Sequence, residues 1–185
     1  MFDRQGNRKY LNGAERRAFL RAANQEPDDL RRAFCLMLFN AGCRISEGLN
    51  VTAGRIDLAN KAIVFETLKR RKRGHFRSVP IPDSLVELLR RIVGGKGPSG
   101  RVWAFSRPTA YRLVKKYMDK AGVSGSMTSP KGLRHSFAVA CLAQKIPLPT
   151  VQKWLGHARM ETTAIYLEVS GDEERELAKR LWHSE

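Results

Sequence analysis

The chain has 185 residues and carries 34 basic against 18 acidic side chains, a formal net charge of +16. Apolar residues make up 42%, enough to fill the core of one domain, so the composition excludes a wholly disordered chain. The longest apolar run, residues 33–39, is far shorter than the ~20 residues of a membrane-spanning helix, and residues 1–10 lack the apolar stretch of a secretory signal. A pI near 10.4 is typical of a protein that binds a polyanion, most often nucleic acid.

The positive charge is unevenly distributed along the chain. Residues 161–185 contain seven acidic and three basic side chains, so a strongly basic body is followed by an acidic tail. The three cysteines cannot form a closed set of disulfides, and Cys35, Cys43 and Cys141 all lie in apolar helical contexts. We therefore expect buried free thiols and a cytoplasmic location, because the cytoplasm keeps thiols reduced.

The first third of the chain predicts helices. Asn12 can cap a helix, with Glu15 three residues later completing a capping box. The segment Pro27-Asp28-Asp29 begins a second helix that ends at Gly42. Ser46 can cap a short third helix.

The middle of the chain changes to strand-like segments. Runs rich in Ile, Val and Phe predict three short strands at residues 55–58, 62–68 and 77–81, followed by a helix at 84–93. Beyond a glycine-rich connection we expect helices at 107–121, 131–144, 149–156, about 161–169 and 171–182. The order predicts a mostly α domain with a small antiparallel three-stranded β-sheet, an α+β fold.

Four short segments carry candidate chemistry. In chain order they are Gly42-Cys43-Arg44 with Glu47, Lys131 with Arg134-His135-Ser136, Leu155-Gly156-His157, and Thr162-Thr163 with Tyr166. Taken singly, each has a plainer reading: a surface ion pair, a basic helix stripe, a histidine at a helix end and a core tyrosine. Together they suit phosphoryl transfer, because a tyrosine hydroxyl can attack a phosphodiester whose oxygens are bound by fixed guanidinium groups.

The order and spacing of these segments resemble the tyrosine recombinases, also called the phage integrase family. The family's first box, Gly-x-Arg-x-x-Glu, is matched by Gly42, Arg44 and Glu47. Its second box, His-x-x-Arg followed by His-Ser-Phe-Ala, is matched over residues 134–138, and its Leu-Gly-His box over residues 155–157. The last box ends at Tyr166, so the resemblance covers nearly the whole chain.

This resemblance implies a site-specific DNA recombinase that breaks and rejoins double-stranded DNA through a 3′-phosphotyrosyl link, without a metal or other cofactor. It implies that Tyr166 is the nucleophile and that Arg44 and Arg134 bind the scissile phosphate. His157 is expected to assist at the phosphate. Glu47 is expected to orient Arg44. His135 is likewise expected to position these side chains without contacting the substrate.

The sequence departs from the family pattern at Lys131, where the second box usually begins with His. A lysine at its ordinary pKa of about 10.4 does not accept the tyrosine proton, so we assign Lys131 to the phosphate as a cation. Burial that lowered its pKa would instead make it a base. The departure also supports an alternative function, a DNA-binding regulator with this fold but impaired catalysis. Type IB topoisomerase-like DNA relaxation is a further alternative.

The family places its catalytic lysine in the hairpin between the second and third strands, where two candidates stand. Counting forward from residues 56–58 favours Lys69, and counting back from Pro80 favours Lys72. We assign Lys69 as the general acid, because a position at a strand end is held more firmly than a loop tip. DNA contacts are expected from Lys72 and Arg73 in the loop and, in the major groove, from Arg107, Arg112, Lys115 and Lys116.

For the domain organisation, we expect residues 1–185 to form a single catalytic domain, with residues 1–10 as an N-terminal extension. The family's separate N-terminal DNA-clamping (core-binding) domain is not expected, which fits either a naturally minimal recombinase or a fragment. Residues 170–185 predict a tail helix exchanged between protomers of a DNA-bound tetramer, with docking on its own domain as the alternative. The tail's apolar side consists of Leu177, Ala178, Leu181 and Trp182.

Overall fold

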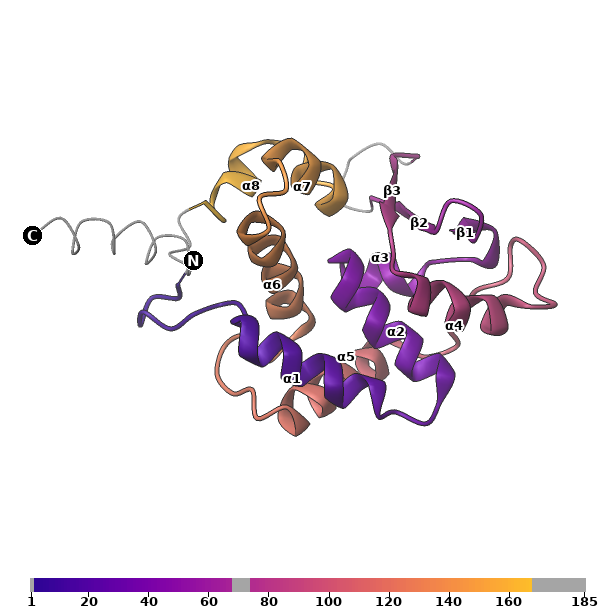
Figure 1. Ribbon diagram of the computed structural model, residues 1–185, viewed down its shortest axis with the longest axis horizontal. Coiled ribbons are helices and arrows are strands. Elements are labelled where there is room, and N and C mark those ends of the chain that lie inside the picture. The colour runs from indigo at the N-terminus through magenta and orange to yellow at the C-terminus, as the bar shows by residue number, and fades with distance from the viewer. Residues whose placement is uncertain (1, 68–73, 168–185) are drawn as a thin grey trace, which may run out of the picture.

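A computed structural model describes residues 2–67 and 74–167 (Figure 1). Its helices are α1 (Gly13–Asn24), α2 (Asp29–Ala41), α3 (Ile45–Leu49), α4 (Asp83–Val93), α5 (Arg107–Lys120), α6 (Pro130–Ala143), α7 (Leu148–Leu155) and α8 (Glu161–Ala164). Strands β1 (Ile56–Asp57), β2 (Ala62–Glu66) and β3 (Phe76–Pro80) form one antiparallel sheet in the order β1-β2-β3. The predicted mostly α fold with a small three-stranded sheet is confirmed.

Some predictions concern residues outside the described ranges. These residues are the lysine candidates Lys69 and Lys72, the loop residue Arg73 and the tail 170–185. The assignments made for them stay predictions. Within the described ranges, no helix combines the length and the apolar character needed to cross a membrane.

Several elements begin or end at residues other than those predicted. Arg44 rather than Ser46 precedes α3, because the backbone of Arg44 is extended while Ser46 is already inside the helix. Strand β1 has only two residues, since residues 53–55 form a 3-10 turn before it. Helix α8 ends at Ala164 instead of near residue 169; no side chain caps its first turn at Met160.

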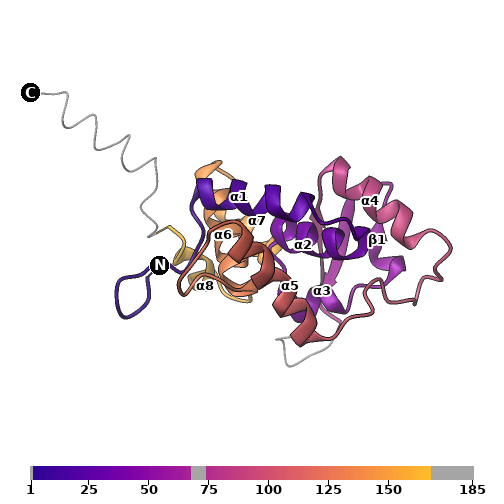
Figure 2. The same cartoon turned by 90° about the horizontal axis from the view of Figure 1, so that it is seen from below.

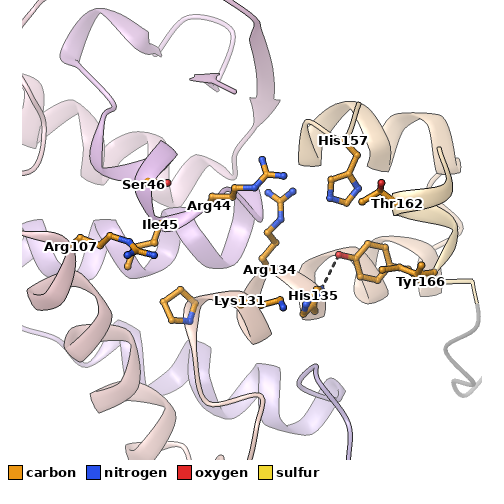
Figure 3. A pocket seen from close by; sticks show the side chains of 12 residues that line it. Arg44, Ile45, Ser46, Arg107, Lys131, Arg134, His135, His157, Thr162 and Tyr166 are labelled. Carbon is orange, nitrogen blue, oxygen red and sulfur yellow. Dashed lines mark hydrogen bonds between the residues drawn. The ribbon is translucent and has the colours of Figure 1, made fainter. Parts of the chain in front are cut away.

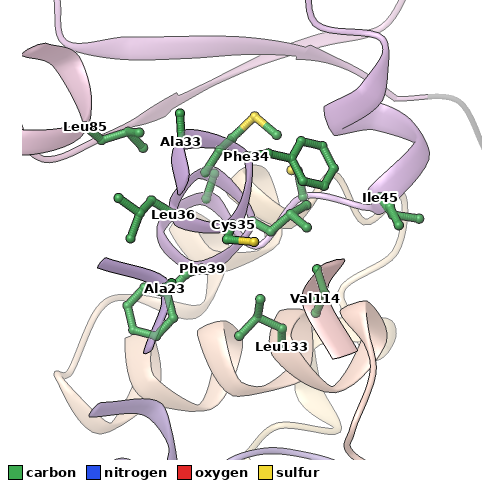
Figure 4. Packing of buried hydrophobic residues seen from close by; sticks show 14 of the residues in the cluster. Ala23, Ala33, Phe34, Cys35, Leu36, Phe39, Ile45, Leu85, Val114 and Leu133 are labelled. Carbon is green, nitrogen blue, oxygen red and sulfur yellow. The ribbon is translucent and has the colours of Figure 1, made fainter. Parts of the chain in front are cut away.

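Helix α2 lies at the centre of the core because residues 33–39 are an unbroken apolar run. The Asp28 side chain accepts a hydrogen bond from the backbone N–H of Arg31 at its start, and Gly42 ends it in the left-handed conformation. Residues 33–39 are all buried and pack against α1, α4 and α6 (Figure 4). Each fully buried Leu or Phe of this kind contributes roughly 1.5–3 kcal/mol of transfer free energy. All three cysteines are buried and free, as predicted.

Helix α6 connects two groups of helices. In Figure 1 it runs from α1 and α5 at one end towards α7 and α8 at the other, and the view in Figure 2 shows the sheet on the far side of α2 from α6. A second, smaller apolar cluster joins Phe137 and Cys141 of α6 to Val151 and Leu155 of α7. Helix α7 also contacts β3, so the C-terminal helices lie beside the sheet.

Candidate active site

Segments that are far apart in the sequence meet at one cavity of about 440 Å³ (Figure 3). They come from the start of α3, the start of α5, the first half of α6, the turn after α7, and the α8 region. The polar residues of the lining are Arg44, Ser46, Arg107, Lys131, Arg134, His135, His157, Thr162 and Tyr166. The structure thus brings six of the predicted site residues to one place, and Arg107 of the predicted DNA-binding set lies with them.

Glu47 is buried behind the cavity and binds two arginines. One carboxylate oxygen accepts a hydrogen bond from Arg44 Nη1 at 2.7 Å, and the other accepts one from Arg77 Nη2 at 2.6 Å. The backbone N–H of Arg44, just before α3, donates to the same carboxylate at 3.0 Å. Burial opposes ionisation of Glu47, but the charge of Arg77 and the hydrogen bond from Arg44 outweigh it and lower the pKa of the carboxyl.

Arg77 is a site residue that the sequence interpretation missed. Its guanidinium donates to Glu47, to the backbone carbonyl of Trp154 at 2.7 Å and to Thr67 Oγ1 at 3.0 Å. The register of β2 and β3 pairs Phe65 with Arg77, and both are buried. A signal was present, because Arg77 occupies an inward position in the alternating strand, and an arginine there needs a buried partner.

Arg134 is fixed between the ends of two helices. Its Nη1 donates to the carbonyl of Gly42, just after α2, at 2.8 Å, and its Nη2 donates to the carbonyl of Leu155, at the end of α7, at 2.7 Å. Burial and the neighbouring charge of Arg44 lower the pKa of Arg134 to about 10. Gly42 is required here in the left-handed conformation with φ +57, since a Cβ at this position would lie 2.3 Å from the Phe137 ring.

The arginines at the cavity outnumber the carboxylates that pair with them, so the cavity carries a net positive charge. Arg44 and Arg77 share the single carboxylate of Glu47, and within the described ranges no carboxylate forms an ion pair with Arg134. Two like charges that are partly removed from water repel each other, so a bound anion would stabilise them. The site is therefore suited to a phosphate group.

His157 lies in the turn after α7. Gly156 ends that helix in the left-handed conformation at φ +67, where a Cβ would lie 2.9 Å from Arg77 Nη1. His157 Nδ1 lies 2.9 Å from Thr163 Oγ1, and its ring stacks on the Tyr166 ring at a centroid distance of 6.3 Å. Burial and the charge of Arg134 lower the pKa of His157 to about 4, so the ring is neutral at pH 7.

The Tyr166 side chain is 3% exposed and points into the cavity from the segment after α8 (Figure 3). Its hydroxyl lies 2.9 Å from Nδ1 of His135. Burial raises the pKa of Tyr166, although Arg134 and Arg44 act in the opposite direction. Burial and the charge of Lys131 lower the pKa of His135 to about 4, which keeps this ring neutral as well.

The predicted DNA-binding residues of α5 do not share one face. Arg107 lines the cavity, and Arg112 and Lys115 are exposed. Lys116 lies about 180° from Arg107 around the helix axis, and its Nζ donates to Glu26 at 3.3 Å. No group of three His, Cys, Asp or Glu side chains in residues 2–67 and 74–167 is arranged to hold a metal ion.

Comparison with known proteins identifies the family. Residues 9–173 match the phage integrase family. The chain belongs to this family. Among its members, the chain is 31% identical over 159 residues to tyrosine recombinase XerA of Pyrococcus furiosus, covering 80% of this chain and 54% of that protein. It is 28% identical over 179 residues to a tyrosine recombinase of Thermosipho africanus, covering 93% of this chain and 61% of that protein.

Solved structures of the phage integrase family share the fold. The crystal structure of XerA recombinase superposes with a TM-score of 0.77 at 24% identity and covers 92% of this chain and 64% of that chain. The pre-cleavage complex of XerH site-specific recombinase bound to difH substrate gives a TM-score of 0.74 at 20% identity, covering 96% of this chain and 59% of that chain. This chain thus spans less than two thirds of the length of each of these four proteins.

Proposed function

We propose that this chain is the catalytic domain of a site-specific DNA recombinase that breaks and rejoins duplex DNA through a 3′-phosphotyrosyl intermediate. The observation that carries the proposal is that the Tyr166 hydroxyl lines the same cavity as Arg44 and Arg134 in a member of the phage integrase family. The family relative XerH has been solved with its difH substrate, which supports DNA as the ligand.

In this mechanism the two arginines bind the non-bridging oxygens of the scissile phosphate. Arg134 donates two hydrogen bonds to carbonyls at helix ends, and Arg44 donates one to Glu47. Both guanidinium groups are therefore oriented before the substrate binds. Charge that develops on the phosphate then meets donors that need no reorganisation, and such fixed donors supply much of the rate enhancement in many enzymes. The buried carboxylate of Glu47 orients Arg44, and the two backbone carbonyls orient Arg134.

The nucleophile and its neighbours complete the reaction. Tyr166 attacks phosphorus, the 5′-oxygen leaves, and the phosphotyrosine bond conserves the energy of the broken phosphodiester. His157 has its Nδ1 engaged by Thr163, which leaves Nε2 for a phosphate oxygen. We assign Lys131 as a further cation at the phosphate and Lys69, outside the described residues, as the proton donor to the leaving oxygen.

The surface around the cavity would bind the duplex. Arg107 lies at the cavity and at the start of α5. Further along this helix, the exposed Arg112 and Lys115 could contact the DNA phosphate backbone or the major groove. Lys116 is the weakest member of this set, because Glu26 already pairs with it. Because the net charge is +16, DNA affinity should fall steeply as salt rises, and a shallow dependence would count against this account.

The proposed assembly is a tetramer on DNA in which residues 170–185 pass to a neighbouring protomer. It rests on the apolar side and the acidic charge of that segment. Truncation after Val169 should abolish DNA-dependent multimerisation while leaving binding of one protomer intact. Unchanged multimerisation would rule out the exchange.

Covalent capture tests the proposed chemistry and does not require the target site to be known. The protein is incubated with a pool of nicked duplexes carrying randomised arms, and adducts that survive denaturation are isolated, digested and sequenced. We expect a recurrent DNA site attached through Tyr166, and no adduct with the Tyr166→Phe variant. Failure to recover any adduct, or an equal yield from the Phe variant, would overturn the proposal.

A further inference from the structure

His135 contacts the hydroxyl of Tyr166 directly. A role limited to positioning other side chains does not explain this contact. The nucleophilic oxygen lies 2.9 Å from His135 Nδ1, and within the described ranges this is its one hydrogen bond. The second histidine at the cavity, His157, stacks on the Tyr166 ring, and its Nδ1 is occupied by Thr163. The residue that begins the second family box is Lys131, which carries no free lone pair while it is charged.

We propose that His135 is the base that accepts the proton of Tyr166, taking over a task for which this chain has no histidine at position 131. The inference rests on the proposed function and names a further catalytic residue for it, because Nδ1 touches the reacting oxygen itself. The neutral tautomer that accepts at Nδ1 carries its own proton on Nε2.

The protons and bonds balance in each direction. As Tyr166 Oη bonds to phosphorus, its O–H bond breaks and an N–H bond forms at His135 Nδ1, while the bond from phosphorus to the 5′-oxygen breaks. The leaving oxygen takes a proton from a separate donor, the lysine assigned above. On rejoining, the 5′-hydroxyl attacks phosphorus and gives its proton back to that lysine, Tyr166 departs as the leaving group, and Nδ1 returns the proton to Oη.

The surroundings of His135 link proton acceptance to substrate binding. Burial keeps the ring neutral, and so do the positive charges of Lys131 and Arg134 on its own helix and of Lys9 on the N-terminal segment, which all lower the pKa of His135. A phosphodiester bound at Arg44 and Arg134 brings a negative charge beside these cations, which raises the proton affinity of the ring. His135 therefore becomes a stronger base when the scissile phosphate is in place.

Replacement by asparagine separates basicity from hydrogen bonding. In His135→Asn the side-chain amide can occupy the place of Nδ1 and still bond to Tyr166, but it cannot take a proton. We expect single-turnover cleavage of the captured DNA site to fall roughly 10²- to 10⁴-fold, the usual contribution of a general base. DNA affinity and the thermal unfolding midpoint should stay close to those of the unaltered protein.

Activation of the nucleophile provides a readout that a structural role would not move. Incorporating 3-fluorotyrosine at position 166 lowers the pKa of the phenol, so cleavage depends less on a base. We expect it to raise the rate of His135→Asn at least about tenfold while changing that of the unaltered protein only a few-fold. Adding Lys131→His to the His135→Asn variant should also restore cleavage.

The outcomes distinguish this inference from the proposed function. If the unaltered protein forms a Tyr166 adduct and His135→Asn cleaves equally fast or faster, the hydrogen bond only holds the resting tyrosine and the base assignment is wrong. An equal effect of fluorotyrosine on both proteins would also overturn it. If the unaltered protein forms no adduct at all, the proposed function fails and the base assignment fails with it.

Discussion

Two sides of the cavity are held in very different ways. The phosphate side consists of Arg44, Glu47, Arg77 and Arg134, and its charged groups are fixed by hydrogen bonds to one another and to the backbone carbonyls at residues 42, 154 and 155. The nucleophile side consists of His135, His157, Thr163 and Tyr166, and two side-chain hydrogen bonds, both of 2.9 Å, link its members.

The difference corresponds to what each side has to do. Cations that stabilise developing charge act best when they are already in place, so a network of hydrogen bonds that crosses α2, α3, α7 and the sheet is appropriate. The nucleophile, in contrast, must exchange a hydrogen bond for a bond to phosphorus and then return. A single neutral hydrogen bond contributes only about 1 kcal/mol, so Tyr166 can leave His135 at little cost.

The largest expected effect is on stability, from removing the carboxylate that joins the phosphate side. Glu47→Gln leaves the buried guanidinium of Arg77 and the partly buried one of Arg44 without an anionic partner, and we expect the free energy of unfolding to fall by about 3–5 kcal/mol. Urea denaturation measures this. Glu87→Gln is the matched control, because the exposed pair Arg90–Glu87 should contribute no more than about 1 kcal/mol. An equal decrease in the free energy of unfolding in both variants would show that the buried ion pairs stabilise the protein no more than an exposed pair.

The next effect is on cleavage, from changing the arginine that spans two helix ends. Arg134→Lys keeps the charge but cannot bond to the carbonyls of Gly42 and Leu155 while also reaching the phosphate. We expect single-turnover cleavage to fall about 10²- to 10³-fold, with DNA affinity changed only a few-fold. Arg90→Lys, at an exposed position of α4 outside the proposed site, is the control and should cleave at nearly the original rate. A mild effect at Arg134 would mean that its orientation matters less than its charge.

Acid should affect the nucleophile side before the phosphate side. The pKa of His157 in the folded protein is about 4, against about 6.5 for an ordinary histidine, so between these values the unfolded chain binds more protons. The free energy of unfolding should be unaffected by this group above about pH 6.5 and should decrease as the pH falls towards 4. His157→Gln should show a shallower decrease in denaturation measured across this range. Parallel curves for the two proteins would contradict the buried neutral state.

The smallest expected effect concerns the residue that holds His157. Thr163 is fully buried, and Thr163→Val removes its hydroxyl while keeping the shape of the side chain. The loss of one hydrogen bond of about 1 kcal/mol should slow cleavage by roughly tenfold or less. Thr162→Val, one residue earlier at the cavity wall, serves as the comparison in the same single-turnover assay. A loss as large as that of Arg134→Lys would show that the nucleophile side is as tightly specified as the phosphate side.

Much of the fold could be predicted from local sequence. The capping box of Asn12 and Glu15, the apolar run of α2 and its end at Gly42 each depend on residues within a few positions of one another, and the structure has them as predicted. The ends of short elements were predicted less accurately, since β1 and α8 are both shorter than predicted. Such elements gain little from local preference, so tertiary contacts decide their ends.

Part of the candidate site could also be predicted from the sequence. The family boxes named Arg44, Arg134 and Tyr166 by spacing alone, and the structure places all three at one cavity. They did not reveal Arg77, which reaches Glu47 across 30 positions of sequence and the Trp154 carbonyl across 77. Nor did they show which histidine contacts the tyrosine hydroxyl and which stacks on its ring.

The amino-acid sequence was enough to predict the mostly α fold, the basic character and the reactive residue types. These follow from composition, periodicity and motif spacing, which act within a turn, a strand or a box. The tertiary structure alone decided which groups are hydrogen-bonded partners: Glu47 with two arginines, Arg134 with two helix ends, and Tyr166 with His135. Hydrogen bonds are short and directional, so they are set only when packing brings distant segments together.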